Sequence, residues 1–192
     1  KLAKNSGAPY MDGLIIKVVP EPQARLAALK TGEVHVAEPP FDDVPAIKDS
    51  GDLEIIVAEN TGQNVFWEFA VHRPPFNGHA TDPATAIDLI YGDLSIPEAC
   101  PVSRGVFGND QEFCNKYRPD YDPEKAKALL AEMGFGEDNP LETSMIVWTG
   151  GNRQKLAEIF QAQLAEVNIK AEIEIMDIGS MNARVRQENE NK

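Results

Sequence analysis

The chain has 192 residues, enough for one large domain or two small ones. Its 42% hydrophobic and 26% charged residues are typical of a folded globular protein. The 31 acidic and 18 basic residues give a formal net charge of -13, which repels nucleic acid and anionic membrane surfaces. Since no run of eighteen apolar residues occurs, we expect no membrane span and no direct insertion into a membrane.

The first 71 residues have the pattern of short strands and helices. A helix is predicted over residues 21–32, where Pro22 occupies the first turn and Gly32 ends the apolar stripe. A short polar helix or turn is predicted over 42–51. A stretch rich in proline and glycine, residues 72–83, marks a domain boundary. Apolar or alternating runs predict strands at 13–19, 33–37, 53–59 and 64–71.

The rest of the chain carries clearer helix signals. Asp-Pro pairs begin predicted helices at residues 82 and 122, and Gly92 and Gly134 end them. The interval between these helices, residues 94–121, is predicted to be one long irregular loop, and such loops are usually functional or packed by their own side chains.

A strand, a helix and a second strand follow, at 143–148, 153–169 and 170–176, and a last helix begins near residue 177. Strands and helices that alternate through short connections predict the α/β class. The change in composition at 72–83 predicts two parts, 1–71 and 72–192.

Candidate metal and anion sites are weak. The only histidines, His35, His72 and His79, lack the spacing of a zinc site, and the acidic run at 120–124 is explained by helix capping rather than calcium binding. The turn at 149–152 joins a strand to a helix, where phosphates can bind, but it has no phosphate-loop pattern. We therefore expect a plain turn in which Asn152 caps the helix, with no metal and no cofactor.

Two cysteines bracket a polar segment of the long loop. A reactive thiol at Cys100 or Cys114 would need a histidine base and positively charged surroundings, and neither is indicated nearby. A disulfide that closes the loop is favoured if the compartment is oxidising. Ser103 lies in the same segment but lacks the nucleophile-elbow pattern.

Two alternatives to a binding protein stay open at this point. A small α/β hydrolase that uses Ser103 or Cys114 would need a base within about 3 Å of its nucleophile. An adaptor that binds another protein would show a large exposed apolar patch instead. No complete catalytic constellation is present in the sequence, which favours binding over catalysis.

Several phrases resemble, in the same order, those of the family 5 extracellular solute-binding proteins. They are PYMDGLIIKVVPEPQARLAALKTGEVHVAE from residue 9, NVFWEFAVHRPPFN from residue 64, ATDPATAIDLIYGDLSIPEACPVSRGVFG from residue 80, YDPEKAKALLAEMGF from residue 121 and QAQLAEVNIKAEIEIM from residue 161. His35 stands where the family usually has aspartate. The resemblance covers almost the whole chain.

This resemblance implies an α/β fold of the periplasmic-binding-protein type II kind. Mixed sheets flanked by helices form two lobes around a ligand cleft, and both lobes are only partly present: 1–71 is part of lobe I and 72–192 is most of lobe II. The implied function is non-catalytic binding of peptides or a similar small solute for an ABC importer, with its membrane permease as partner. The implied location is periplasmic or extracellular, with a lipid anchor if the organism is Gram-positive.

The resemblance also implies site residues. An aromatic residue before the P-P-F phrase lines the cleft of peptide-binding members, which makes Phe66 and Trp67 candidates, although alternation along a strand lets at most one face the ligand. Arg104 is a candidate for a bidentate contact with a carboxylate. Because the implied compartment lies outside the cytoplasm, we predict a disulfide between Cys100 and Cys114.

The chain also departs from the family. A full member is more than twice as long, and the start of this sequence has neither an initiator methionine nor the pattern of a signal peptide. We therefore expect a mature, trimmed or partial sequence that binds its solute weakly by itself. We also expect exposed strand edges near 13–19 or 64–71, because strands without neighbours leave open backbone groups.

Overall fold

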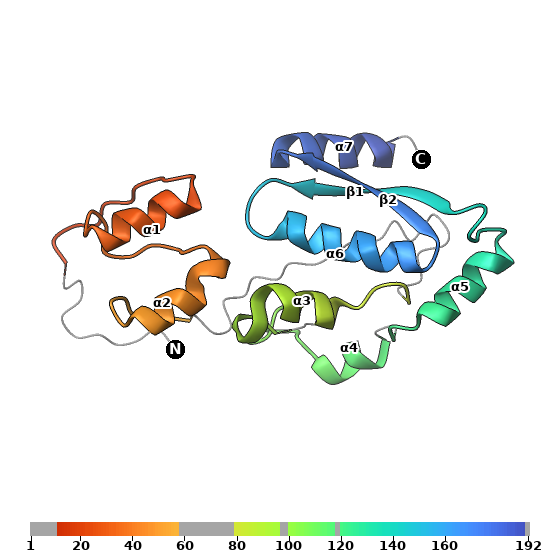
Figure 1. Cartoon of the computed structure of the whole chain (residues 1–192), viewed down its shortest axis with the longest axis horizontal. Coiled ribbons are helices and arrows are strands. Elements are labelled where there is room, and N and C mark those ends of the chain that lie inside the picture. Colours follow the sequence, from red (N-terminus) through yellow and green to blue (C-terminus); the bar gives the residue numbers. More distant parts are fainter. Residues whose placement is uncertain (1–10, 58–78, 97–99, 118–119, 191–192) are drawn as a thin grey trace. The chain divides into compact units, whose positions relative to one another are not determined.

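The computed structural model describes residues 11–57, 79–96, 100–117 and 120–190 (Figure 1). The chain divides into two compact units, Lys1–Ile56 and Val57–Lys192. Residues 58–78, which include the domain boundary predicted after residue 71, lie outside the described residues. The assignment of the two parts to two lobes therefore stays a prediction.

Unit 1 is built around two short helices, α1 (Pro22–Lys30) and α2 (Val44–Ser50), with a turn of 3-10 helix, η1 (Phe41–Asp43), directly before α2. Both helices were predicted, and both have a proline near the start, where its missing N–H costs no helical hydrogen bond. The helices bury a small apolar core of Leu26, Ala28, Val44 and Ile47.

The strands predicted for unit 1 are not formed. Residues 13–19, 33–37 and 53–57 do not form β-strands, so the strand predictions for these residues are wrong. The last two residues of the strand predicted at 53–59 lie outside the described residues. A strand needs a neighbour for its backbone hydrogen bonds, and no described segment pairs with these residues. The remaining predicted strand, 64–71, lies outside the described residues.

Unit 2 begins with helices whose ends follow the predicted chemistry. In α3 (Pro83–Tyr91) the Asp82 carboxylate accepts hydrogen bonds from two backbone N–H groups of the first turn, at 3.1 and 3.2 Å. A 3-10 turn, η2 (Gly92–Leu94), follows it. In α5 (Pro123–Glu132) Asp122 accepts from the backbone N–H of Lys125 at 2.9 Å. Both capping predictions are confirmed.

One helix of unit 2 was not predicted. α4 (Gln111–Tyr117) lies within the interval 94–121, for which the sequence predicted a loop. The Asp110 carboxylate accepts from the backbone N–H of Phe113 at 2.9 Å, as a helix-capping side chain does. None of the seven residues of α4 is buried, and Phe113 and Tyr117 contact each other along its surface with ring centres 4.9 Å apart.

The centre of unit 2 is a strand–helix–strand arrangement. β1 (Leu141–Trp148) and β2 (Ile169–Met176) are parallel neighbours, in register from Leu141 opposite Ile169 to Trp148 opposite Met176. The helix between them, α6 (Arg153–Glu166), lies along one side of the strand pair, and α7 (Ile178–Glu190) lies along the other (Figure 1). The predicted α/β class is thus confirmed as helices around a small parallel sheet.

The core of unit 2 surrounds α6. Towards its C-terminal end, Leu164 joins Ala126 and Leu130 of α5 and the buried residues of β2. Towards its N-terminal end, Leu156 and Phe160 pack with Ala86 of α3. Because α6 contacts the sheet, α3 and α5, its burial fixes the positions of the elements around it.

A cavity in this core should cost much of the stability of unit 2. Leu130 is 3% exposed, and Leu130→Ala should lower the free energy of unfolding by about 2–5 kcal/mol through lost burial and the space left behind. Leu89 is 68% exposed, so Leu89→Ala is the matched control and should change stability little. Urea unfolding followed by circular dichroism measures both, and equal effects would contradict the described core.

Candidate functional site

The strongest candidate site lies where β1 ends and α6 begins. The strands are parallel, so β1 and β2 both end at this edge of the sheet, and ligands of open α/β sheets bind beyond such carboxyl ends. The backbone N–H of Thr149 donates to the carbonyl of Met176 at 3.0 Å, which ties the turn after β1 to the end of β2. The turn then passes through Gly150 and Gly151 into α6.

The two glycines give an arginine room to lie over the turn. Gly150 and Gly151 have φ angles of 106° and 61°, in the left-handed region that favours glycine. Nη1 of Arg153 donates to the carbonyl of Gly150 at 2.6 Å. A Cβ atom on Gly151 would stand 3.2 Å from the same Nη1, so a larger residue at 151 would crowd the guanidinium.

An aromatic ring lies against this guanidinium. Cζ of Arg153 lies 4.4 Å from the centre of the Trp148 ring, which is the geometry of a cation–π contact. Tyr91, at the end of α3, packs against the cluster of Leu156 and Phe160 in α6. Burial raises the pKa of Tyr91, and the positive charge of Arg153 opposes that rise. Trp148 therefore contacts the guanidinium, and Tyr91, on a separate element, is close enough for the charge of Arg153 to act on it.

The charge of Arg153 is not neutralised in the described structure. It is the first residue of α6, where the helix dipole is also positive, and the first turn of α6 contains no acidic residue. None of the ion pairs among the described residues involves Arg153. Its Nε and the Nδ2 of Asn152 are buried donors without an acceptor. Such a place favours a bound group with negatively charged oxygen atoms.

Asn152 does not cap α6, so this part of the prediction for the turn is wrong. Its side chain makes no capping hydrogen bond. An N-cap residue usually has extended backbone angles, whereas Asn152 has φ of -91° and ψ of 18°. Its Nδ2 is buried and has no hydrogen-bond partner among the described residues.

The candidates named from the sequence stay predictions. Phe66 and Trp67 are outside the described residues. Arg104 is exposed, on the segment between the two cysteines. Sequence reasoning missed Trp148 and Arg153. The available signal was an aromatic residue at the end of a predicted strand, followed by two glycines and an arginine at the start of a helix.

A disulfide joins Cys100 to Cys114 of α4, with 5.3 Å between the Cα atoms. This is the pairing predicted from the resemblance, and it engages the sulfur that a hydrolase would use at Cys114. Nδ1 of His79 lies 2.8 Å from the carbonyl oxygen of Asp120, so this histidine is paired away from the alternative nucleophile Ser103. His72 is outside the described residues. Among the described residues, no histidine is therefore hydrogen-bonded to Ser103 or Cys114.

The residues that the structure describes offer neither a metal site nor a membrane-spanning helix. In that part of the chain, no three His, Cys, Asp or Glu side chains gather in a way that could hold a metal ion. No helix there is long and apolar enough to cross a membrane.

Comparison with known proteins gives the family. Residues 4–191 match the bacterial extracellular solute-binding proteins, family 5 Middle. The chain belongs to this family. Its members are solute-binding proteins rather than enzymes, which agrees with the prediction of a non-catalytic protein.

Curated relatives within the family are much longer than this chain. Di/tripeptide-binding protein 2 of Pseudomonas aeruginosa is 28% identical over 94% of this chain and 35% of its own length. The glutathione-binding protein GsiB of Escherichia coli is 27% identical over 93% of this chain and 36% of its own length. The chain thus spans about 35% of the length of the curated relatives that it matches.

Solved structures support the fold. The periplasmic binding protein DppA from Helicobacter pylori, in complex with the peptide STSA, matches with a TM-score of 0.67 and 24% identity, over 86% of this chain and 33% of its own. NikA from Brucella suis, in complex with Fe(III)-EDTA, matches with a TM-score of 0.65 and 20% identity, over 91% and 39%. At these identities the likeness shows that the chain shares part of the fold of these binding proteins.

Removal of the disulfide should loosen the segment from 100 to 114. By the loop-entropy model, a closed loop of this length stabilises the folded state by about 3 kcal/mol. The variant with Cys100→Ser and Cys114→Ser should lose about that much, and α4 should become sensitive to proteolysis. Dithiothreitol should destabilise the unaltered protein to a similar extent and leave the variant unchanged. Thiol labelling of the native protein before reduction would contradict the disulfide.

The start of α7 should be sensitive to acid through Asp177. The Ser180 hydroxyl, together with the backbone N–H groups of Ser180 and Gly179, donates to this carboxylate and holds its pKa below the ordinary value of 3.8. Because the folded pKa is the lower one, the stabilisation is complete above the unfolded pKa and is lost as pH falls through the folded pKa.

This effect can be separated from that of other carboxylates with Asp177→Asn, which keeps a capping oxygen but does not titrate. Amide resonances of Gly179 and Ser180 should shift as the Asp177 carboxylate is protonated, with a midpoint below its ordinary pKa of 3.8 in the unaltered protein. The variant should show a much smaller shift over the pH range of that titration. Identical titrations of both proteins would contradict the role of Asp177.

Proposed function

We propose that this chain is part of a protein that binds a peptide-like small solute outside the cytoplasm and delivers it to the permease of an ABC importer. Family membership supports solute binding without catalysis. The names of relatives support the solute class, since they include a di/tripeptide-binding protein, a glutathione-binding protein and a probable peptide ABC transporter periplasmic-binding protein.

The observation that carries the solute class is the unneutralised Arg153. A guanidinium beside a helix N-terminus suits a carboxylate, because its planar fork can donate two parallel hydrogen bonds to the two carboxylate oxygens. Peptides end in a carboxylate, and glutathione also carries carboxylates. Trp148 adds an aromatic surface against which the apolar atoms of such a solute can pack.

Arg153 would have to change its contacts to take this role. Its Nε is shielded and one Nη1 hydrogen is used by the carbonyl of Gly150. A solute carboxylate can be met by the remaining Nη hydrogens, or by Nε after a rotation of the side chain. Both are local movements of one long side chain on a rigid helix, so the backbone of the site need not change.

The finer expectations concern the complete protein. A ligand cleft between two lobes, mixed sheets in each lobe, and contacts from Phe66, Trp67 or Arg104 stay part of the proposal. So do the periplasmic or extracellular location, the lipid anchor in a Gram-positive organism and weak binding by this chain alone. The chain spans about 35% of its curated relatives, so binding is best tested in a full-length protein that contains this sequence.

The test is calorimetric titration of the full-length protein with dipeptides, tripeptides and glutathione, each beside a form with its carboxylates amidated. Arg153→Gln should weaken binding of the acids about 10- to 100-fold, the range for a lost hydrogen bond to a charged group. Amidation of the solute should weaken binding to the unaltered protein by a similar factor. It should weaken binding to the Arg153→Gln variant only slightly further, because the contact is already lost.

Lys170→Gln is the matched control, since it removes one positive charge from an exposed position of the same unit. Arg104→Gln tests the other arginine candidate. If Arg153→Gln binds every acid as tightly as the unaltered protein does, Arg153 is not the carboxylate contact. If none of these solutes binds the unaltered protein, the proposed solute class is wrong.

A further inference from the structure

The side chain of Arg153 is held over the turn by two contacts. Its Nη1 donates to the carbonyl of Gly150 at 2.6 Å, and its Cζ lies 4.4 Å from the centre of the Trp148 ring. Its Nε is buried and has no acceptor among the described residues. We call this arrangement the resting state of Arg153.

The resting state does not allow the strongest contact with a carboxylate. A guanidinium meets a carboxylate bidentately through a pair of N–H groups, either the two Nη groups or Nε and the Nη beside it. In Arg153 the first pair includes Nη1, which is engaged with Gly150, and the second includes the shielded Nε. Single hydrogen bonds are available from the resting state, but a bidentate contact requires the side chain to leave it.

The absence of a side chain at position 151 makes room for the resting state. A Cβ atom on Gly151 would stand 3.2 Å from Nη1 and 3.9 Å from Cζ of Arg153. Non-bonded atoms are most stable about 3.5–4.0 Å apart, so an alanine at 151 would crowd the guanidinium. A Cβ atom on Gly150 would stand 3.9 Å from Nη1, which is an ordinary contact. The crowding is relieved most easily by movement of the long arginine side chain.

From these observations we propose that Arg153 exchanges between the resting state and a bound state that meets a solute carboxylate, and that Gly151 is the positioning residue that permits the resting state. The Gly150 carbonyl and the Trp148 ring then compete with the solute for one guanidinium. Competition of this kind lowers the apparent affinity according to the fraction of molecules in which the arginine is available. The proposal rests on the proposed function, since it concerns the carboxylate contact at the same site.

The consequence is that a substitution at position 151 strengthens binding. Gly151→Ala disfavours the resting state and leaves the arginine itself unchanged. A cation–π contact and one hydrogen bond from a charged group together favour the resting state by about 10-fold. Gly151→Ala should therefore tighten the binding of acids about 3- to 10-fold, because the solute no longer has to displace the guanidinium from the turn.

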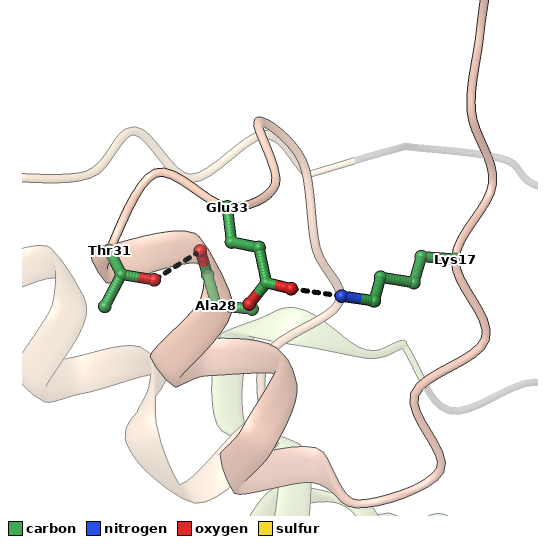
Figure 2. A network of polar contacts seen from close by, with 4 residues as sticks. All are labelled: Lys17, Ala28, Thr31 and Glu33. Carbon is green, nitrogen blue, oxygen red and sulfur yellow. Dashed lines mark hydrogen bonds and ion pairs between the residues drawn. The ribbon is translucent and has the colours of Figure 1, made fainter.

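Gly32 offers a matched control in unit 1. Its φ of 75° is close to the 61° of Gly151, so alanine meets similar backbone strain at both positions. A Cβ atom on Gly32 would have nothing within 4 Å beyond its chain neighbours. The side chains of those neighbours, Thr31 and Glu33, are bonded to partners of their own (Figure 2). Gly32→Ala therefore reproduces the strain without crowding a guanidinium.

Calorimetric titration of the full-length protein with trialanine and with glutathione tests the proposal. Gly151→Ala should bind both acids about 3- to 10-fold more tightly than Gly32→Ala does. In an Arg153→Gln background Gly151→Ala should give no gain, because no arginine remains to be released. Equal affinities of the two glycine variants would overturn the proposal. Weaker binding by Gly151→Ala would also overturn it, because the arginine would then bind from the resting state.

Exchange of the Arg153 Nε–H proton with water, followed by NMR, is an independent readout. Without solute, this proton should exchange at least about 10-fold more slowly than that of the exposed Arg186, because Nε of Arg153 is shielded. Gly151→Ala should accelerate the exchange, whereas a merely structural role of Gly151 would leave it unchanged. Equally fast exchange at both arginines of the unaltered protein would overturn the resting state.

The unaltered protein decides the matter if Gly151→Ala does not fold. Saturating glutathione should then shift the Nε–H resonance of Arg153, because the guanidinium leaves the Trp148 ring. A resonance that stays unmoved while glutathione binds would overturn the proposal.

Failure of this proposal is distinguishable from failure of the proposed function. If no solute binds, or if Arg153→Gln binds every acid as the unaltered protein does, the proposed function fails and the competition fails with it. If Arg153→Gln weakens binding but Gly151→Ala binds like the control, only the exchange between two states is wrong.

Discussion

The arrangement of unit 2 depends on the burial of one face of α6. Leu156, Phe160 and Leu164 lie on that face and contact different neighbours along the helix. Apolar burial of three large side chains is worth several kcal/mol, more than any single polar contact on the surface of this unit. A hydrogen bond adds to this packing: the side-chain amide of Gln161 donates to the carbonyl of Ala171 in β2 at 2.6 Å.

This packing also sets the geometry of the candidate site. Because α6 is packed against the sheet, the distance from its first residue to the end of β1 is fixed. The turn between them is short, and its two glycines let the chain reverse while Arg153 folds back over it. The contact between Arg153 and Trp148 therefore follows from the crossover helix and the turn together, rather than from a recognisable binding motif.

Local features could be predicted from the sequence, and features that depend on distant partners could not. The starts of α3 and α5 follow from Asp82 and Asp122, whose side chains bond to backbone groups only a few residues away. The strand predicted at 13–19 depends on a neighbour that the described residues do not supply. α4 was missed because it is only seven residues long and buries none of them, so its apolar pattern is too short to predict a helix.

In the candidate site and the disulfide, too, some features could be predicted from the sequence and others could not. The link between Cys100 and Cys114 could be predicted because the family implies an oxidising compartment and the chain has no other cysteine. Trp148 and Arg153 could not be predicted as partners, since five positions separate them in sequence and their contact depends on the path of the turn. The capping prediction for Asn152 was wrong because its backbone angles, which the sequence does not reveal, differ from the extended angles of a usual N-cap.

The pairing of α3 with α6 has a mechanical consequence. The side-chain amide of Gln163, late in α6, accepts from the backbone N–H of Asp82, where α3 starts, at 2.8 Å. Tyr91, where α3 ends, packs against the first turns of α6. The two helices are therefore antiparallel and contact each other near both ends. Two contacts that far apart oppose both sliding and relative rotation, so α3 and α6 should move as one body and carry the start of α6, with Arg153, along with them.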